Sequence, residues 1–223
     1  MNRLIPIFGV LLGLFVIYSC SNKSDYEYPP VKMEYLSADI GSDGTVSSIL
    51  TDDGKRYLVA ENLSSFNSVA DSTIRVVSYY EIETVADSIS GVKIYAMSKA
   101  VAPLPKSRAE FGNGVKTDPV DVVGIWMGRN YLNIILNVKV NNGVHYFNFV
   151  EDTVYTVARK KTVSLELYHD ARNDSMYYWR RAYLSVPLSQ YATSGVDSVI
   201  IDFRLYQYNG KEKTYQLKYV PLG

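Results

Sequence analysis

The chain has 223 residues, with 23 basic and 23 acidic side chains, 20 tyrosines and a single cysteine. A chain with one cysteine cannot form an intrachain disulfide. Its formal net charge is zero, so it has no excess of basic residues of the kind that nucleic-acid binding requires. We therefore expect a protein that is stabilised by its hydrophobic core and has no nucleic-acid partner.

The amino terminus has the pattern of a secretory signal. Arg3 is followed by an uncharged segment at 4–18, which is shorter than the ~20 apolar residues that span a bilayer. Ile17 and Ser19 stand at positions −3 and −1 from Cys20, an arrangement that resembles the lipobox of bacterial lipoproteins. The resemblance implies cleavage before Cys20, its modification by diacylglycerol and palmitate, and anchoring in the outer membrane, on the periplasmic or the surface side. The alternative is an uncleaved anchor with an incidental cysteine.

We therefore place a lipoprotein signal peptide at residues 1–19 and a tether at 20–31. The tether is polar, and Pro29-Pro30 favours an extended backbone. Removing Arg3 leaves 22 of the 23 basic residues against 23 acidic ones. The exported body is therefore near neutral, and its predicted attachment to the membrane depends on acylated Cys20.

Residues 32–100 alternate apolar and polar side chains and predict a small β-barrel. The sequence Asp53-Gly54 favours a tight hairpin, because both residues adopt positive φ readily. Five short strands suit a barrel of the OB type. A segment rich in proline and glycine follows at 101–118 and predicts a linker. The expected strands are 32–40, 45–51, 55–60, 74–84 and 91–98.

Residues 119–223 predict six or seven further strands, which suits an antiparallel β-sandwich. In the segment 131–140, alternate residues are apolar and share one face, with Ile135 as an exception on the polar face. The segment 199–206 alternates in the same way. Asn142-Gly143 and Asn209-Gly210 predict two more hairpins. The expected fold class is all-β: a signal peptide and tether, an OB-like barrel, and a sandwich.

Three segments resemble the NigD-like lipoproteins of the Bacteroidetes cell envelope. They are "GSDGTVSSILTDDGKRYLVAENL", "VGIWMGRNYLNIILNV" and "LELYHDARNDS". In the third, His169, Asp170 and Asp174 stand where such proteins carry a His-Asn…Asp pattern, with Asp170 in place of Asn. The resemblance implies an amino-terminal OB-like domain and a carboxy-terminal β-sandwich. It also implies a bacteriocin immunity or accessory role, which was proposed for the operon that gives the family its name.

No residue is assigned a catalytic role. The chain has no G-x-S-x-G nucleophile elbow and no cofactor motif. Two histidines with carboxylates could bind a metal ion, the candidates being His145, His169, Asp170 and Asp174. The favoured interpretation is structural, because acidic residues in turns usually bond their own backbone. We therefore predict no metal site and no cofactor.

An excess of aromatic residues suggests a binding surface instead. If "SMYYWRR" is extended, Tyr177, Trp179 and Arg181 share one face of a strand. Exposed aromatic and arginine side chains mark surfaces that bind proteins or glycans. The favoured interpretation is structural: one face of this segment lies in the sandwich core, and arginine stems cover the other face.

A short motif also recurs. Asp-Ser or Asp-Thr followed by an aliphatic residue, methionine or threonine resembles the O-glycosylation acceptor of exported Bacteroidetes proteins, although Asp-Ser also starts turns. The predicted function is a lipid-anchored envelope protein that acts as a non-enzymatic binding module for a protein or glycan. The alternatives are an immunity factor and a glycan or peptidoglycan hydrolase. The acceptor residues are Ser72, Ser88, Thr153, Ser175 and Ser198.

Overall fold

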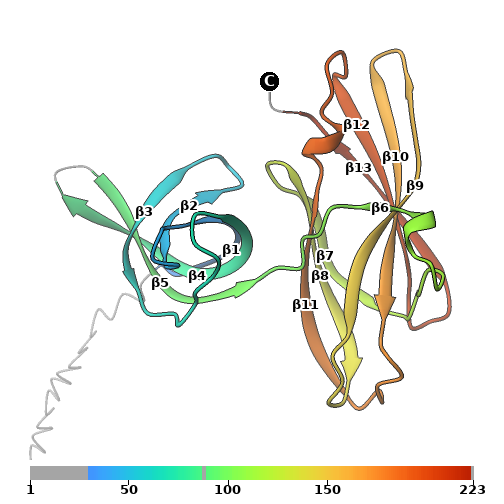
Figure 1. Cartoon of the computed structure of the whole chain (residues 1–223), viewed down its shortest axis with the longest axis horizontal. Helices are drawn as coiled ribbons and strands as arrows, with labels where there is room; N and C mark the ends of the chain where they lie inside the picture. The colour runs from blue at the N-terminus through green and yellow to red at the C-terminus, as the bar shows by residue number, and fades with distance from the viewer. Residues whose placement is uncertain (1–29, 87–88, 222–223) are drawn as a thin grey trace, which may run out of the picture.

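The computed structural model describes residues 30–86 and 89–221. Two β units lie side by side, and the chain passes once from the first to the second after Lys99 (Figure 1). Cys20 and the predicted signal peptide lie outside the described residues, as does Ser88. No helix within the described ranges is long and apolar enough to cross a membrane.

The first unit is a closed barrel with the strand order β1-β2-β3-β5-β4. β3 pairs in parallel with β5, and the other neighbours are antiparallel. Alternate residues such as Leu36, Val76 and Ile94 are fully buried and fill the interior. The predicted OB-like barrel is confirmed. Its strands are β1 (Lys32–Ile40), β2 (Val46–Thr51), β3 (Arg56–Asn62), β4 (Thr73–Ala86) and β5 (Ile89–Lys99).

The second unit is a sandwich of two sheets with the strand orders β13-β12-β10-β9-β6 and β11-β8-β7. The alternation at 131–140 is confirmed, because Leu132, Ile134 and Leu136 are fully buried between the sheets. Residues 199–206 supply the facing layer. The elements are β6 (Lys106–Ser107), η1 (Arg108–Glu110), β7 (Asp121–Met127), β8 (Tyr131–Val140), β9 (Tyr146–Val157), β10 (Lys160–Asp170), β11 (Tyr178–Pro187), η2 (Ser189–Tyr191), β12 (Ser198–Tyr206) and β13 (Glu212–Tyr219).

The structure differs from the sequence prediction in three respects. β10 pairs in parallel with β12, and β6 with β9, so the five-stranded sheet is mixed. The segment 101–118, predicted as a linker, instead packs on the sandwich, because β6 joins a sheet edge and both Val101 and Thr117 form β-bridges. Asn142-Gly143 connects strands of different sheets, so the hairpin predicted there is wrong.

A close approach explains Gly143. The Asp174 carboxylate accepts hydrogen bonds from the backbone N–H groups of Asn141 (2.7 Å) and Asn142 (3.4 Å). A Cβ on residue 143 would lie 2.6 Å from the Asp174 carboxyl carbon. Glycine is therefore needed here for space, whereas Gly54 and Gly210 have the positive φ that their predicted hairpins require.

Candidate functional site

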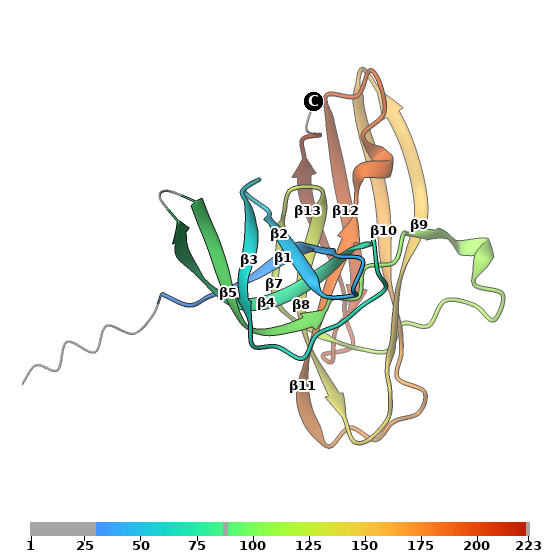
Figure 2. The same ribbon diagram turned by 60° about the vertical axis from the view of Figure 1, so that its left-hand side comes forward.

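The barrel docks on the outer face of the three-stranded sheet of the sandwich. When the molecule is turned, β1 and β4 lie in front of β7 and β8 (Figure 2). The Tyr35 hydroxyl in β1 donates to the Ile134 carbonyl in β8 at 2.7 Å. The Tyr35 ring also meets Trp126 and Tyr183 edge-on, with centroids 5.5 and 6.3 Å apart. Burial raises the pKa of Tyr35 well above its usual value, so the phenol keeps the proton that it donates.

A buried arginine forms the polar centre of this junction. Arg75 in β4 is 4% exposed. Its guanidinium donates to Asp52 at 2.7 Å, and to Asn133 and Ser185 of the sandwich at 3.0 Å each. The guanidinium also stacks on the Tyr131 ring at 4.2 Å. Asp52, Asn133 and Ser185 are bonded to one another around it, through Asn133 Nδ2 to Asp52 (2.8 Å) and Ser185 Oγ to Asn133 (2.7 Å).

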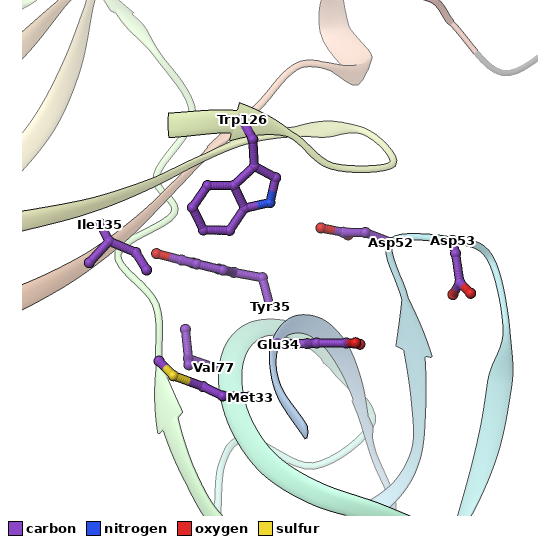
Figure 3. Close-up of a pocket in the computed structure, with 8 residues that line it drawn as sticks. All are labelled: Met33, Glu34, Tyr35, Asp52, Asp53, Val77, Trp126 and Ile135. Carbon is purple, nitrogen blue, oxygen red and sulfur yellow. The ribbon is translucent and has the colours of Figure 1, made fainter. Parts of the chain in front are cut away.

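A cavity of about 350 Å³ opens beside this cluster (Figure 3). Its walls come from both units and are aromatic and aliphatic on one side, with carboxylates on the other. The Asp52 carboxylate extends toward Trp126 and Tyr35, whereas Asp53 points away from them (Figure 3). The lining residues are Met33, Glu34, Tyr35, Asp52, Asp53, Val77, Trp126 and Ile135.

The three carboxylates of the cavity differ in their partners. Asp53 accepts from Thr51 and Lys55, and these bonds lower its pKa to about 2. Asp52 Oδ2 accepts hydrogen bonds from Arg75 and Asn133, but Asp52 Oδ1 is buried and meets no donor in the described part of the chain. Glu34 accepts from the Tyr80 hydroxyl through Oε2 at 2.8 Å. Burial, followed by this bond to Glu34, raises the pKa of Tyr80 well above its usual value.

Strand β11 places the predicted aromatic and arginine residues at the surface. Tyr177 precedes the strand and is 77% exposed, Trp179 is 51% exposed, and Arg181 is also exposed. Trp179 and Arg181 share the outer face of the sheet with Tyr183 and Ser185, which contact the barrel. The favoured interpretation, which placed one face of this segment in the sandwich core, is therefore wrong.

Lysine and tyrosine side chains extend this surface around Trp179. Tyr208 meets the Trp179 ring edge-on with centroids 5.3 Å apart. The Lys139 ammonium lies 5.1 Å from the centre of the Trp179 ring and 5.2 Å from that of Tyr208. The Tyr208 hydroxyl also accepts the Lys139 backbone N–H at 2.7 Å. The aromatic side chains are therefore held in place by contacts between β11, β8 and the turn after β12. We call Trp179, Arg181, Lys139 and Tyr208 the outer patch.

The two histidines contact each other. His145 Nδ1 lies 2.9 Å from His169 Nε2, and His169 Nδ1 donates to the Asp118 carbonyl at 2.9 Å. Burial lowers the pKa of His169. Asp174 approaches His145 Nε2 at 3.4 Å, whereas Asp170 accepts from the backbone of Arg172. The described residues contain no group of three or more metal-ligating side chains with suitable geometry. His145 also borders a second groove at the junction, of about 700 Å³.

The predicted glycosylation residues have different surroundings. Thr153 and Ser175 are exposed, whereas Ser72 and Ser198 are half-buried. The Ser72 hydroxyl donates to the Val69 carbonyl at 2.5 Å, which is the turn bonding that the alternative interpretation expects.

Sequence reasoning missed the cluster around Arg75 and the cavity. One signal was present: Ile135 interrupts the polar face of its strand. In the structure Ile135 packs with Tyr35 and Val77 between the two units and lines the cavity. An apolar residue on a polar face indicated a docking surface, but not what docks there.

The fold and this junction define a two-unit β protein, with an OB-type barrel fixed to the outer face of a sandwich. The family model of the NigD-like C-terminal beta sandwich domain matches residues 103–219. A NigD-like immunity protein from Bacteroides caccae is 37% identical, with a TM-score of 0.76 over 88% of this chain and 100% of its own. The chain belongs to the NigD-like family, as the sequence resemblance predicts.

Two more distant structures share the fold. A putative toxin-related protein from Parabacteroides distasonis is 20% identical, with a TM-score of 0.65 over 85% of this chain and 93% of its own. A putative lipoprotein from Bacteroides fragilis is 11% identical, with a TM-score of 0.56 over 86% of this chain and 100% of its own. No curated protein matches this chain.

Proposed function

We propose that the protein is a lipid-anchored cell-envelope module that binds a partner protein through the outer patch and the adjoining junction, without catalysis. The observation that carries the proposal is the exposure of Trp179 at 51% beside exposed Arg181. Tryptophan and arginine are enriched among the residues that dominate binding energy at protein interfaces. The proposal of a lipid anchor depends on the sequence around Cys20.

The rigidity of the outer patch supports binding. Trp179 packs edge-on against Tyr208 and beneath the Lys139 ammonium, so little side-chain freedom remains to be lost when a partner binds. The histidines support a role without catalysis, since His169 uses both ring nitrogens in contacts with His145 and the Asp118 carbonyl.

The test compares two exposed aromatic residues. Trp179→Ala should weaken capture of the partner from native envelopes by about 2 kcal/mol or more, as truncation of a central anchor does. Tyr155→Ala is the matched control, because Tyr155 is 56% exposed and lies on β9 of the other sheet. Circular dichroism should show both variants folded. Equal capture by the two variants would remove the outer patch from the proposal.

The membrane anchor is tested separately. Cys20→Ser should abolish labelling by fatty acids and release the protein from the envelope fraction. Labelling that persists in Cys20→Ser would refute the predicted lipid anchor and would leave the binding proposal unaffected.

A second candidate function is immunity to a secreted toxin, because the 37% identical structure is called a NigD-like immunity protein. On this hypothesis, the captured partner is a toxin, and cells that lack the gene become sensitive to it. Full resistance of such cells to the captured protein would reject immunity and leave binding as the function.

A further inference from the structure

The cavity between the barrel and the sandwich combines apolar walls with three carboxylate residues. Met33, Val77 and Ile135 form an aliphatic wall, and the rings of Tyr35 and Trp126 adjoin it. Such walls suit the methylene stem of a long side chain. The rings also offer faces that attract a cation.

The opposite side of the cavity carries negative charge. Asp52 Oδ1 is buried without a donor in the described ranges. Glu34 is bonded only through Oε2, to the neutral hydroxyl of Tyr80, among the hydrogen bonds of those ranges. Arg75 and Lys55 form ion pairs with Asp52 and Asp53 respectively, whereas Glu34 has no such ion pair within the described ranges and adds negative charge.

Among the described residues, no cation lines this space. The lining set has three carboxylates and neither lysine nor arginine. Arg75 approaches Asp52 through Oδ2, on the side of Asn133 and Ser185. A cationic occupant would therefore meet no competing lysine or arginine among these lining residues.

We propose that this cavity binds the side chain of a lysine from the partner protein, with its stem along the aliphatic wall and its ammonium against the Glu34 carboxylate on the acidic side. An ammonium has three donors and no acceptor, which matches a cavity whose charged lining residues are all carboxylates. The volume of about 350 Å³ accommodates one long side chain. This inference rests on the proposed function, since it names what the partner inserts beside the outer patch.

The probe is Nα-acetyl-lysine amide, titrated into the full folded domain pair (residues 21–223) at low salt. Its binding should shift the Trp126 indole N–H resonance in nitrogen–proton spectra. Nα-acetyl-norleucine amide has the same stem without the charge and should bind about tenfold more weakly, because it makes no charge-assisted hydrogen bond. Equal binding of the two probes, or no shift at Trp126 with the lysine probe, overturns the proposal.

Two variants test whether the charge of Glu34, rather than the shape of the cavity, determines binding of the lysine probe. Glu34→Gln keeps an acceptor for Tyr80 and should weaken the lysine probe by about tenfold, whereas it should leave the norleucine probe unchanged. Glu83→Gln, a carboxylate on β4 outside the lining set, is the matched control and should bind like the parent protein. If Glu34→Gln lowers the melting temperature, Trp126→Leu serves instead, with binding followed by saturation transfer to the probe. An affinity for the lysine probe unchanged in the variant that is used would refute the site.

The result also separates this inference from the proposed function. Loss of partner capture in Trp179→Ala together with no binding of the lysine probe rejects the lysine site and keeps the binding module. Capture that is insensitive to Trp179→Ala but lost in Glu34→Gln keeps the lysine site and rejects the outer patch.

Discussion

Replacing Arg75 by methionine tests whether the arginine cluster fixes the barrel to the sandwich. The substitution removes the guanidinium's hydrogen bonds to Asp52, Asn133 and Ser185 and leaves the Asp52 carboxylate without its cation. Removing one partner of a buried ion pair costs about 3–5 kcal/mol. Because the Asp52 side chain is 23% exposed, water replaces part of what is lost, and we expect about 2–4 kcal/mol.

Chemical denaturation measures this loss. Trp126 lies at the junction and reports separation of the two units by fluorescence. For a chain of this size, each kcal/mol lowers the melting temperature by about 2–4 °C, so the loss corresponds to roughly 4–16 °C. Arg56→Met is the control, because the Arg56–Asp39 pair is at the surface and its arginine is 54% exposed. A surface pair contributes about 0–1 kcal/mol.

The double variant Arg75→Met, Asp52→Asn sharpens the test. It removes the stranded charge as well as the arginine, so it should be more stable than the sum of the two single changes predicts. The reasoning fails if Arg75→Met costs no more than Arg56→Met, or if the two single changes add without coupling. Either result would mean that the apolar contacts around Tyr35 hold the junction without help from the ion pair.

Two further predictions concern Gly143 and the dependence of stability on pH. Gly143→Ala should cost about 1–3 kcal/mol because its Cβ would lie 2.6 Å from the Asp174 carboxyl carbon. Gly112→Ala has open space around it, and an equal loss in a denaturant titration would contradict this account. For acid stability, burial lowers the pKa of His169 below 6.5, so the unfolded chain takes up this proton first and stability falls as pH drops below about 6.5. The lowered pKa of Asp174 adds a second loss as pH drops below about 3.8. His169→Gln should flatten the upper part of this pH profile, and an unchanged profile would reject the assignment.

The alternation of apolar and polar residues predicted the strands well, because each strand buries one face. The five strands of the barrel were placed within a few residues, since alternation and the Asp53-Gly54 turn act over short distances. Asn142-Gly143 was misassigned for the opposite reason. Its glycine is required by Asp174, a residue far along the chain, and a turn motif contains no information about such a contact.

The candidate site could not be predicted from the sequence, for a related reason. Asn133 and Ser185 stand at outward positions of their strands, where polar residues normally meet water, yet both are fully buried. Their burial follows from a second unit lying on that face. The interruption of the polar face by Ile135 indicated such a contact, but the partner, Tyr35, is a residue of the first strand.

The same polar contacts connect stability to binding. Apolar burial alone is non-directional and tolerates rotation of one unit on the other. Arg75 donates in fixed directions to one residue of the barrel and two of the sandwich, and the planar guanidinium allows little variation in their geometry. The angle between the units is therefore fixed by hydrogen bonds, and so are the positions of Trp126 and Asp52 across the cavity. A cavity held in this way requires little reorganisation to bind, so a variant that loosens the junction should weaken binding of the lysine probe even though Arg75 does not line the cavity.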